Sequence, residues 1–412
     1  MKKTFLFILL LNLLVQSAFA LFPDRRKEQF PGEPAYYLVP FPYEYPGIGS
    51  GFIFMGSASN MFGSRADVTV GQITGDVTGS IAAVSDVFLI PNFIYVSAQK
   101  QQLDTISIQN YSTRGMDSQK DDFTFIEVTE LDSLDYQVNL TLWERRIELY
   151  QQKLKQNLTV AKIRDSEGAL IANLTEPYMQ ENEGTMQGVT LDLTDDRQDA
   201  RKGIRLKMEK SESPRADAYS ADFYQINKTV EFYIPIGQRS TWAFHGFRSD
   251  AIVRDEGVTD SDTLLEILGL TCETGDTVCE ATQDDLVQQF ADQNKNGTAA
   301  SLGGLNQLRS YGSGRFSGGH TQYVSTELRI NLTEEFTPLN YWIWSDTRTG
   351  VQAAFFYETG TVAETEAELG NESRSSAGAG LRMVTGSGFV YRVDVATGSD
   401  GTVPIIWFYY PW

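Results

Sequence analysis

The chain has 412 residues and a formal net charge of -20 at pH 7. So acidic a chain lacks the basic surface that DNA or RNA backbones require, which excludes a nucleic-acid partner. The 41% hydrophobic content resembles that of a soluble protein, but a transmembrane β-barrel alternates apolar and polar positions and escapes a hydropathy scan. The 12% aromatic content fits the aromatic girdles of such a barrel.

Residues 1–20 predict a secretory signal peptide. Lys2 and Lys3 precede an apolar core, and Ala18-Phe19-Ala20 forms a small-residue cleavage site. The core is too short to anchor the chain, because a membrane helix takes ~20 apolar residues. Residues 21–47 carry six prolines, which predict an extended periplasmic segment that is too short to be a domain.

Residues 48–412 predict strand after strand, separated by Gly, Asn, Asp and Ser turns. In residues 323–332, for example, Val324, Leu328 and Ile330 alternate with Glu327 and Arg329. Charged side chains occupy the second face of almost every segment. We therefore expect an all-β fold, a transmembrane antiparallel barrel of about 16 strands with lipid outside and water within. A soluble secreted β-protein or adhesin is the alternative.

Charged residues of both signs fall on the predicted lumen face. They form either a selectivity lining or a paired network that braces the barrel, and their near balance favours bracing. The predicted lumen charges are Arg205, Lys207, Glu209, Glu231, Glu327, Arg329, Arg382, Arg392 and Asp394.

The longest insertion, residues 255–320, predicts an extracellular loop that is functional or disordered. Two parts of it, residues 263–270 and 282–293, have helical spacing. The two cysteines, Cys272 and Cys279, lie between them, and in an exported protein they predict a disulfide.

A glycine-rich run, residues 303–318, ends this insertion. Glycine permits backbone conformations that other residues avoid, so Gly303, Gly304, Gly312 and Gly314 predict a shaped loop that presents an arginine and a tyrosine, Arg309 and Tyr311. On composition alone, a flexible surface loop is equally consistent.

The end of the sequence, residues 404–412, predicts a short aromatic strand. Alternation places Ile406, Phe408, Tyr410 and Trp412 toward lipid. Exported barrels commonly end in this way, so Phe408, Tyr410 and Trp412 are interpreted as a C-terminal signal.

Little in the sequence supports catalysis. His245 and His320 are the only histidines, and Ser249 shares a strand face with His245 without being adjacent to it. Residues 292–297 match the beginning of a calcium loop, but Gly303 stands at the twelfth position, where a bidentate acid belongs. We therefore expect no enzyme activity, no metal and no cofactor.

Several segments, in this order, resemble the bacterial surface antigen superfamily, the BamA/TamA-type barrels of Gram-negative outer membranes. Together they cover about the last half of the chain. They are Asp195-Asp196-Arg197 with Gly203, Gly303-Gly304 followed by Leu308-Arg309-Ser310-Tyr311, Glu327-Leu328-Arg329, Phe356-Tyr357-Glu358-Thr359-Gly360, Gly378-Ala379-Gly380-Leu381-Arg382, and Arg392-Val393-Asp394-Val395-Ala396.

The resemblance implies that the glycine-rich loop folds into the barrel and that Arg309 pairs with the strand acid, here Glu358. Ser310 stands where the family has glycine, and Glu358 stands where it has aspartate. Residues 21–47 are too short for a POTRA domain, so the chain resembles the barrel-only members. Alternation independently places Glu358 on the lumen face.

The resemblance also implies a role in inserting or moving protein or lipid. A weak seam would open between a first strand near residues 49–56 and the last strand. The implied partners are outer-membrane lipid, unfolded barrel or secreted clients, and a periplasmic partner. The alternative is a passive channel or structural barrel plugged by residues 303–318.

Overall fold

The computed structural model describes residues 34–412 apart from 60–65, 213–217, 269–271, 273–274, 334–337, 342–343 and 386–389. The predicted signal peptide lies outside this range. No helix among the described residues is long and apolar enough to cross a membrane.

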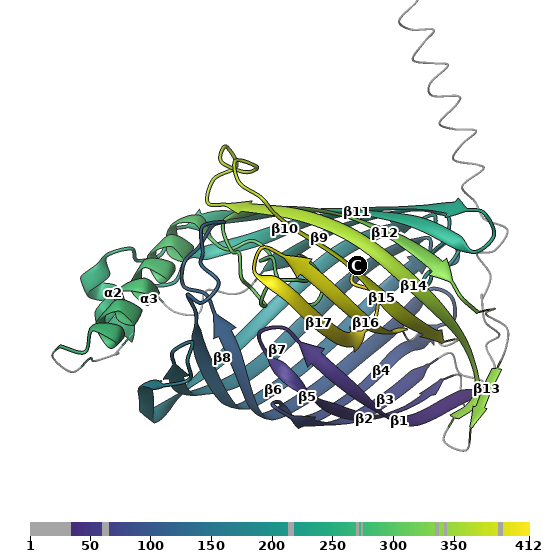
Figure 1. The fold of residues 1–412 in the computed structure, drawn as a ribbon, viewed down its shortest axis with the longest axis horizontal. Coiled ribbons are helices and arrows are strands. Elements are labelled where there is room, and N and C mark those ends of the chain that lie inside the picture. Colours follow the sequence, from purple (N-terminus) through teal and green to yellow (C-terminus); the bar gives the residue numbers. More distant parts are fainter. Residues whose placement is uncertain are drawn as a thin grey trace, which may run out of the picture.

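Sixteen antiparallel strands close into one barrel, as the sequence predicts (Figure 1). The first twelve are β1 (Ala35–Tyr45), β2 (Gly49–Ser59), β3 (Asp67–Gly75), β4 (Thr78–Ile90), β5 (Ile94–Asn110), β6 (Thr124–Leu142), β7 (Ile147–Arg164), β8 (Leu170–Asp192), β9 (Gly203–Glu212), β10 (Asp222–Ile236), β11 (Ser240–Asp255) and β12 (His320–Asn331). The last four are β14 (Trp344–Ala363), β15 (Arg374–Thr385), β16 (Val390–Gly398) and β17 (Gly401–Phe408). A short strand, β13 (Pro338–Tyr341), pairs with the beginning of β14, which itself pairs directly with β12.

The two ends of the barrel differ. Helices α2 (Ser261–Leu268) and α3 (Thr277–Asn296) lie at one end, on the left of Figure 1. We call this the helix end, and the opposite end, where short turns join β6 to β7 and β10 to β11, the turn end. Long loops outside and short turns toward the periplasm are the usual arrangement of outer-membrane barrels. A disulfide joins Cys272, in the segment between the helices, to Cys279 at the beginning of α3.

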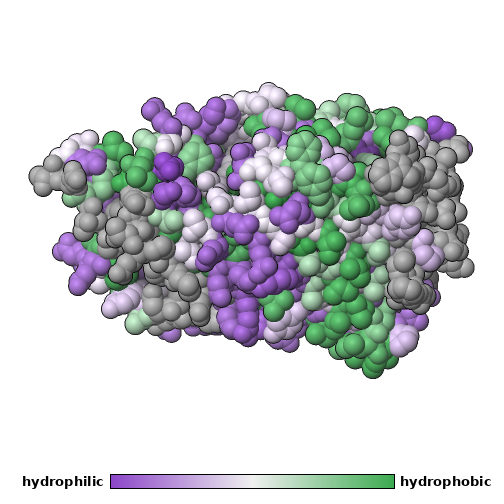
Figure 2. All heavy atoms as spheres, turned by 90° about the horizontal axis from the view of Figure 1, so that it is seen from below, coloured by the Kyte–Doolittle hydropathy of each residue, from purple (hydrophilic) through white to green (hydrophobic). Residues whose placement is uncertain are grey.

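Apolar side chains on the outer wall form a belt. On β6, Leu134, Tyr136, Val138, Leu140 and Leu142 all point outward and are between 39% and 48% exposed. An exposed apolar surface of this extent needs a lipid environment. Toward the helix end the outer face of the same strands becomes polar, and Figure 2 shows this change from hydrophobic to hydrophilic surface on one side of the barrel.

The inner face of the first six strands also carries an apolar cluster, which alternation did not predict. Ten buried residues from the β1–β6 region and one residue from β17 pack together on the inside of the wall. We call them the inner apolar cluster: Tyr37, Phe41, Tyr43, Ile53, Met55, Ile73, Val77, Leu103, Val128, Leu131 and Phe408. Six buried charges lie on β12, β14, β15 and β16, and others lie on β7, β8 and β10 or in the turns beside them.

The expected boundary at residue 47 is wrong, because part of the proline-rich segment is a barrel strand. Ala35–Tyr45 forms β1 and pairs with β2 along its whole length. The prolines do not break this strand because β1 is an edge strand, the place in a sheet where a missing N–H is tolerated. The side chain of Leu38 is 60% exposed on its outer face.

Candidate functional site

The glycine-rich loop returns from α3 into the barrel lumen. Backbone bonds join Leu302 and Phe316 in both directions and close the loop at its base. Gly303 and Gly304 have φ of 107° and 102°, a conformation that strongly favours glycine. Leu302, Leu308 and Phe316 have no exposed surface, so this part of the insertion is a packed plug rather than a flexible surface loop.

In the turn at the plug tip, the residue with a positive φ is Leu308 and not Ser310. Leu308 has a positive φ of 48°, whereas Ser310 is not among the residues with positive φ. The N–H of Tyr311 donates to the carbonyl of Leu308 at 3.0 Å and closes the turn. A glycine at position 310 is therefore not required for a tight turn in this chain.

Arg309 lies at the plug tip and is completely buried. Its Nε lies 3.2 Å from Glu358 Oε2, so the pair that the resemblance implies is formed. Its backbone N–H donates to the same carboxylate. The guanidinium also lies 2.9 Å from Asp394 Oδ2 and 3.3 Å from the centre of the Phe356 ring.

The predicted lumen charges on the last strands join Arg309 in one network. Arg382 Nη2 lies 2.6 Å from Glu327 Oε2, Arg329 Nε lies 2.7 Å from Glu327 Oε1, and Arg392 Nη1 lies 2.8 Å from Asp394 Oδ2. We call the seven residues the charge cluster: Arg309, Arg329, Arg382, Arg392, Glu327, Glu358 and Asp394. Their direct pairing across β12, β14, β15 and β16 is the bracing arrangement.

The remaining predicted lumen charges pair outside the cluster. Arg205 lies 3.0 Å from Glu231, and Lys207 lies 2.8 Å from Glu209.

Further contacts hold the plug against the wall. Tyr311 donates its hydroxyl hydrogen to the Ser375 carbonyl at 3.0 Å, and Arg392 donates to the Leu305 carbonyl at 2.6 Å. Arg315 pairs with Asp400 at 3.1 Å, in the turn between β16 and β17. The plug is thus fixed mainly to the strands that precede the seam.

Two loop glycines allow close approach. A Cβ on Gly303 would lie 2.1 Å from the Gly312 carbonyl oxygen, and one on Gly312 would lie 2.5 Å from the Tyr111 hydroxyl. The φ of Gly314 is 69°.

The first and last strands meet at a weak seam. In the described residues, only one ladder pair joins β1 to β17, Glu44 with Ile406. By contrast, eleven pairs join β1 to β2 and eight join β16 to β17. The seam therefore lies at β1, and not at residues 49–56 as the sequence predicted.

Prolines and aromatic rings replace backbone pairing at this seam. The carbonyl of Pro42 accepts a hydrogen bond from the Tyr391 hydroxyl of β16 at 2.8 Å, so the seam-facing groups of β1 belong to Pro42 and the residues of the same parity, including Pro40. Neither proline has an N–H to donate. The rings of Phe41, Tyr391 and Phe408 lie 4.9 to 5.6 Å apart and fill the space.

The last residues do not continue β17 toward lipid, and the predicted orientation of Tyr410 and Trp412 is wrong. Strand β17 ends at Phe408. Tyr409 has a φ of 62°, and its N–H donates to the Val390 carbonyl at 2.7 Å. This left-handed residue turns the chain into the lumen. Phe408 itself is only 6% exposed and belongs to the inner apolar cluster.

Residues from five different elements hold the inward-turned segment. The Tyr410 hydroxyl lies 2.7 Å from Asp199 in the turn after β8 and 2.8 Å from Gln352 Oε1 on β14. Arg329 of β12 lies 4.0 Å from the Tyr410 ring centre. The Trp412 ring stacks on His245 of β11 at 5.1 Å and lies 6.3 Å from Tyr233 of β10. Sequence alternation could not reveal this cradle, since its members are far apart in the chain.

The two histidines, His245 and His320, pack against or pair with neighbouring side chains. His245 is buried on the lumen side beneath Trp412. Ser249 lies about 13 Å further along the strand, and its Oγ accepts the N–H of Ala300. His320 Nδ1 lies 3.0 Å from Asp250. The structure does not bring His245 and Ser249 together as a catalytic pair.

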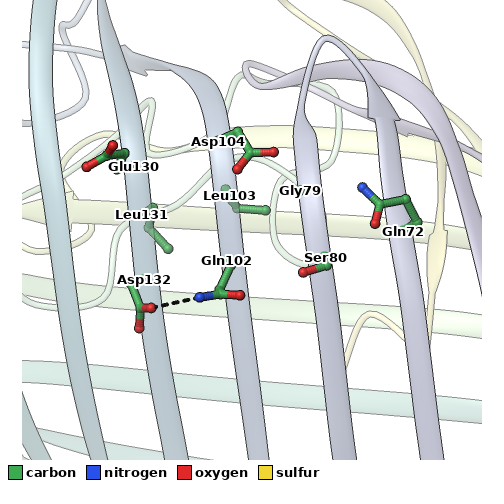
Figure 3. Close-up of a pocket in the computed structure, with 9 residues that line it drawn as sticks. All are labelled: Gln72, Gly79, Ser80, Gln102, Leu103, Asp104, Glu130, Leu131 and Asp132. Carbon is green, nitrogen blue, oxygen red and sulfur yellow. Dashed lines mark hydrogen bonds between the residues drawn. The ribbon is translucent and has the colours of Figure 1, made fainter.

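The wall also contains a polar pocket of about 420 Å³ where the β5–β6 ladder is interrupted (Figure 3). Leu103 and Leu131 belong to the inner apolar cluster, so the polar residues next to them face outward. Gln102 donates to Asp132 at 3.1 Å. The other residues lining the pocket are Gln72, Gly79, Ser80, Asp104 and Glu130. Among the described residues, no group of three or more acidic, His or Cys side chains could hold a metal ion.

No protein-family model matches this chain, and no curated protein matches it. Among solved structures, CdiB from Escherichia coli has a TM-score of 0.51 at 13% identity, covering 92% of this chain and 62% of that one. BamA from Haemophilus ducreyi lacking POTRA domains 1–3 has a TM-score of 0.46 at 12% identity, covering 92% of this chain and 71% of that one. CdiB from Acinetobacter baumannii has a TM-score of 0.48 at 10% identity, covering 91% and 59%.

This chain therefore spans less than two thirds of the CdiB chains. At this identity the likeness to Escherichia coli CdiB shows the fold alone. A barrel of this fold suggests the bacterial outer membrane.

Proposed function

We propose that this outer-membrane barrel assists the insertion or translocation of protein or lipid by opening at the seam between β1 and β17. One observation carries the proposal: a single ladder pair joins these strands, whereas their other neighbours are fully paired. Each backbone hydrogen bond contributes roughly 0.5–1.5 kcal/mol net. The seam therefore separates at a far lower cost than any other pair of long strands.

The prolines limit the hydrogen bonds that the strand edges at an open seam can make with a client strand. Exposed strand edges bind other strands by backbone pairing, but Pro40 and Pro42 can only accept hydrogen bonds. Pro404 limits β17 in the same way. A client strand would pair briefly with these edges and then be released. The clients are unfolded barrel or secreted proteins or lipid, and we propose that a periplasmic partner delivers them and that no catalytic step is involved.

A disulfide across the seam tests this role. Glu44 and Ile406 are direct partners in the antiparallel ladder, a spacing that a disulfide can bridge. The Glu44→Cys/Ile406→Cys variant, oxidised, should lose the ability to accelerate folding of an unfolded outer-membrane barrel into vesicles, and reduction should restore it. Ala58→Cys/Val68→Cys joins the fully paired strands β2 and β3 and serves as the matched control. Full activity of the oxidised seam variant would refute the proposal.

The buried plug favours a second candidate, a passive channel or structural barrel closed by residues 303–318. Its tip is attached to the wall through Arg309, Tyr311 and Arg315. In planar bilayers this candidate predicts a large conductance once Arg309→Ala releases the plug, together with no effect of the seam disulfide on any client. A seam-dependent folding activity would exclude it.

A further inference from the structure

Arg382 and Arg392 lie directly opposite each other on neighbouring strands. They are partners in the ladder between β15 and β16, and their side chains are only 1% and 0% exposed on the lumen side. Like charges at directly opposed positions of a sheet repel each other. Burial strengthens this repulsion, because a charge is screened less inside a protein than in water. The pair therefore needs negative charge close to both members.

The carboxylates of the charge cluster supply only part of that charge. Arg382 lies 2.6 Å from Glu327 and 3.6 Å from Asp394. Arg392 lies 2.8 Å from Asp394. Each of these two acids also pairs with another arginine of the cluster. Four guanidinium groups therefore share three carboxylates, which leaves an excess of one positive charge within the cluster.

Some hydrogen-bond donors of the two arginines are also unsatisfied. Nε and Nη1 of Arg382 and Nε of Arg392 are buried, and they have no hydrogen-bond partner among the residues that the structure describes. The other nitrogens hold the side chains in place, and Arg392 Nη2 donates to the Leu305 carbonyl of the plug at 2.6 Å. A buried donor without an acceptor is destabilising, and more so when it is charged.

The inward-facing neighbours in the same row cannot supply the missing acceptor. Gln352 of β14 is the ladder partner of Arg382, but its amide already donates to Asp199 and accepts from Tyr410. Trp407 of β17 is the ladder partner of Arg392, and an indole has a donor but no acceptor. The unsatisfied donors therefore lie between two side chains that do not compensate them.

We propose that Arg382 and Arg392 bind a small monovalent anion, of the size of chloride, between them. The charge of one such anion equals the excess of the charge cluster, and the anion accepts hydrogen bonds from the unsatisfied donors. Buried charges in proteins are generally paired in this way. A water molecule would accept the same hydrogen bonds but would not offset the charge. This site does not depend on the proposed function.

The anion would also stabilise the attachment of the plug. Arg392 donates to the plug at Leu305, and Arg309 of the plug tip lies 2.9 Å from Asp394, the acid that Arg392 contacts. Without the anion, the repulsion between Arg382 and Arg392 acts directly on these contacts. We therefore expect the folded state, plug included, to depend on the anion.

Replacement of gluconate by chloride tests the site. The full chain in a nonionic detergent is unfolded with urea at constant ionic strength, and tryptophan fluorescence measures the equilibrium constant between the folded and unfolded states. An anion that binds only the folded chain multiplies this constant by one plus the ratio of its concentration to its dissociation constant. About 100 mM chloride should therefore raise the constant about tenfold if the dissociation constant is on the order of 10 mM. Gluconate serves as the comparison anion because it is too large to be buried between two side chains.

Two variants identify the binding residues. Arg382→Gln and Arg392→Gln each remove the excess charge and should abolish the response to chloride. Lys207→Gln is the matched control, since it removes a positive charge from another part of the lumen wall, where Lys207 pairs with Glu209, and it should keep the full response. No response in the unchanged protein, or an undiminished response in both arginine variants, would overturn the site.

A second measurement does not require the variants to fold. Bromide can replace chloride at such a site, and its anomalous X-ray scattering locates it in a crystal. Crystals of the unchanged protein grown in sodium bromide should show a bromide peak within hydrogen-bonding distance of both Arg382 and Arg392. A map without a peak at this position would refute the site, even if chloride stabilises the protein.

Discussion

The charge cluster predicts unequal losses of stability for substitutions at Arg309 and at Glu358, which form a direct ion pair. It contains four arginines and three carboxylates, all buried. Loss of Arg309 leaves three charges of each sign, whereas neutralising Glu358 leaves four positive charges against two negative ones. We therefore expect Glu358→Gln to destabilise the barrel more than Arg309→Leu, although both break the same ion pair.

The magnitudes follow from the contacts. Breaking a buried pair so that a charge is left uncompensated costs about 3–5 kcal/mol, which is the expected range for Glu358→Gln. This variant also weakens the bond from the Tyr323 hydroxyl at 2.6 Å. For Arg309→Leu we expect about 1–3 kcal/mol, the cost of the hydrogen bonds that its partners lose.

Urea unfolding in detergent, followed by heat-modifiable gel migration, measures the free energy of unfolding. The comparison includes the unchanged protein, the two single variants and the double variant. A coupling of at least ~1 kcal/mol between the two positions is expected for residues in direct contact. The reasoning is refuted if Arg309→Leu proves the more destabilising change, or if the two effects simply add.

Two further predictions concern the cradle and the plug. Burial raises the pKa of Asp199, but Arg201, Tyr410 and Gln352 outweigh this effect and hold that pKa below its ordinary value. The ionised Asp199 carboxylate therefore stabilises the fold above the unfolded pKa of ~3.9, and this stabilisation is lost as the pH falls through the lower folded pKa. The loss of unfolding free energy caused by Asp199→Asn should therefore be the same at pH 8 and at pH 5, and a smaller loss at pH 5 would contradict this assignment. In the plug, Gly303→Ala should accelerate proteolysis of residues 303–318 more than Gly312→Ala. A Cβ at position 303 would clash with backbone, and residue 303 has a positive φ, whereas a Cβ at position 312 would meet only the ends of flexible side chains. Equal protease sensitivity would argue against a packed plug.

Sequence alternation predicted the barrel and about its number of strands, since the outward apolar positions repeat on almost every strand. The plug and the pairing of Arg309 with Glu358 followed from the resemblance, with alternation placing Glu358 on the lumen face. These features depend on local pattern or on short motifs, both of which can be detected in one sequence.

Other features depend on position within the closed barrel. Pro40 and Pro42 indicate a break in an isolated segment, whereas on the open edge of β1 they fit a strand. The left-handed turn at Tyr409 has no sequence signal, because no glycine or asparagine marks it. The inner apolar cluster was missed because β1 and β2 carry apolar side chains on both faces, a pattern without alternation.

The inner apolar cluster determines which side of the seam can move. Strand β1 is anchored from within by Tyr37, Phe41 and Tyr43, as well as by its complete ladder with β2. Strand β17 contributes a single residue, Phe408, to the cluster, and its one full ladder is with β16. When the two strands separate, β1 therefore stays in place and β17 moves. The surface that this movement exposes beside β1 is apolar. A passage of that kind would admit lipid chains or the apolar edge of a client while offering ions a poor path.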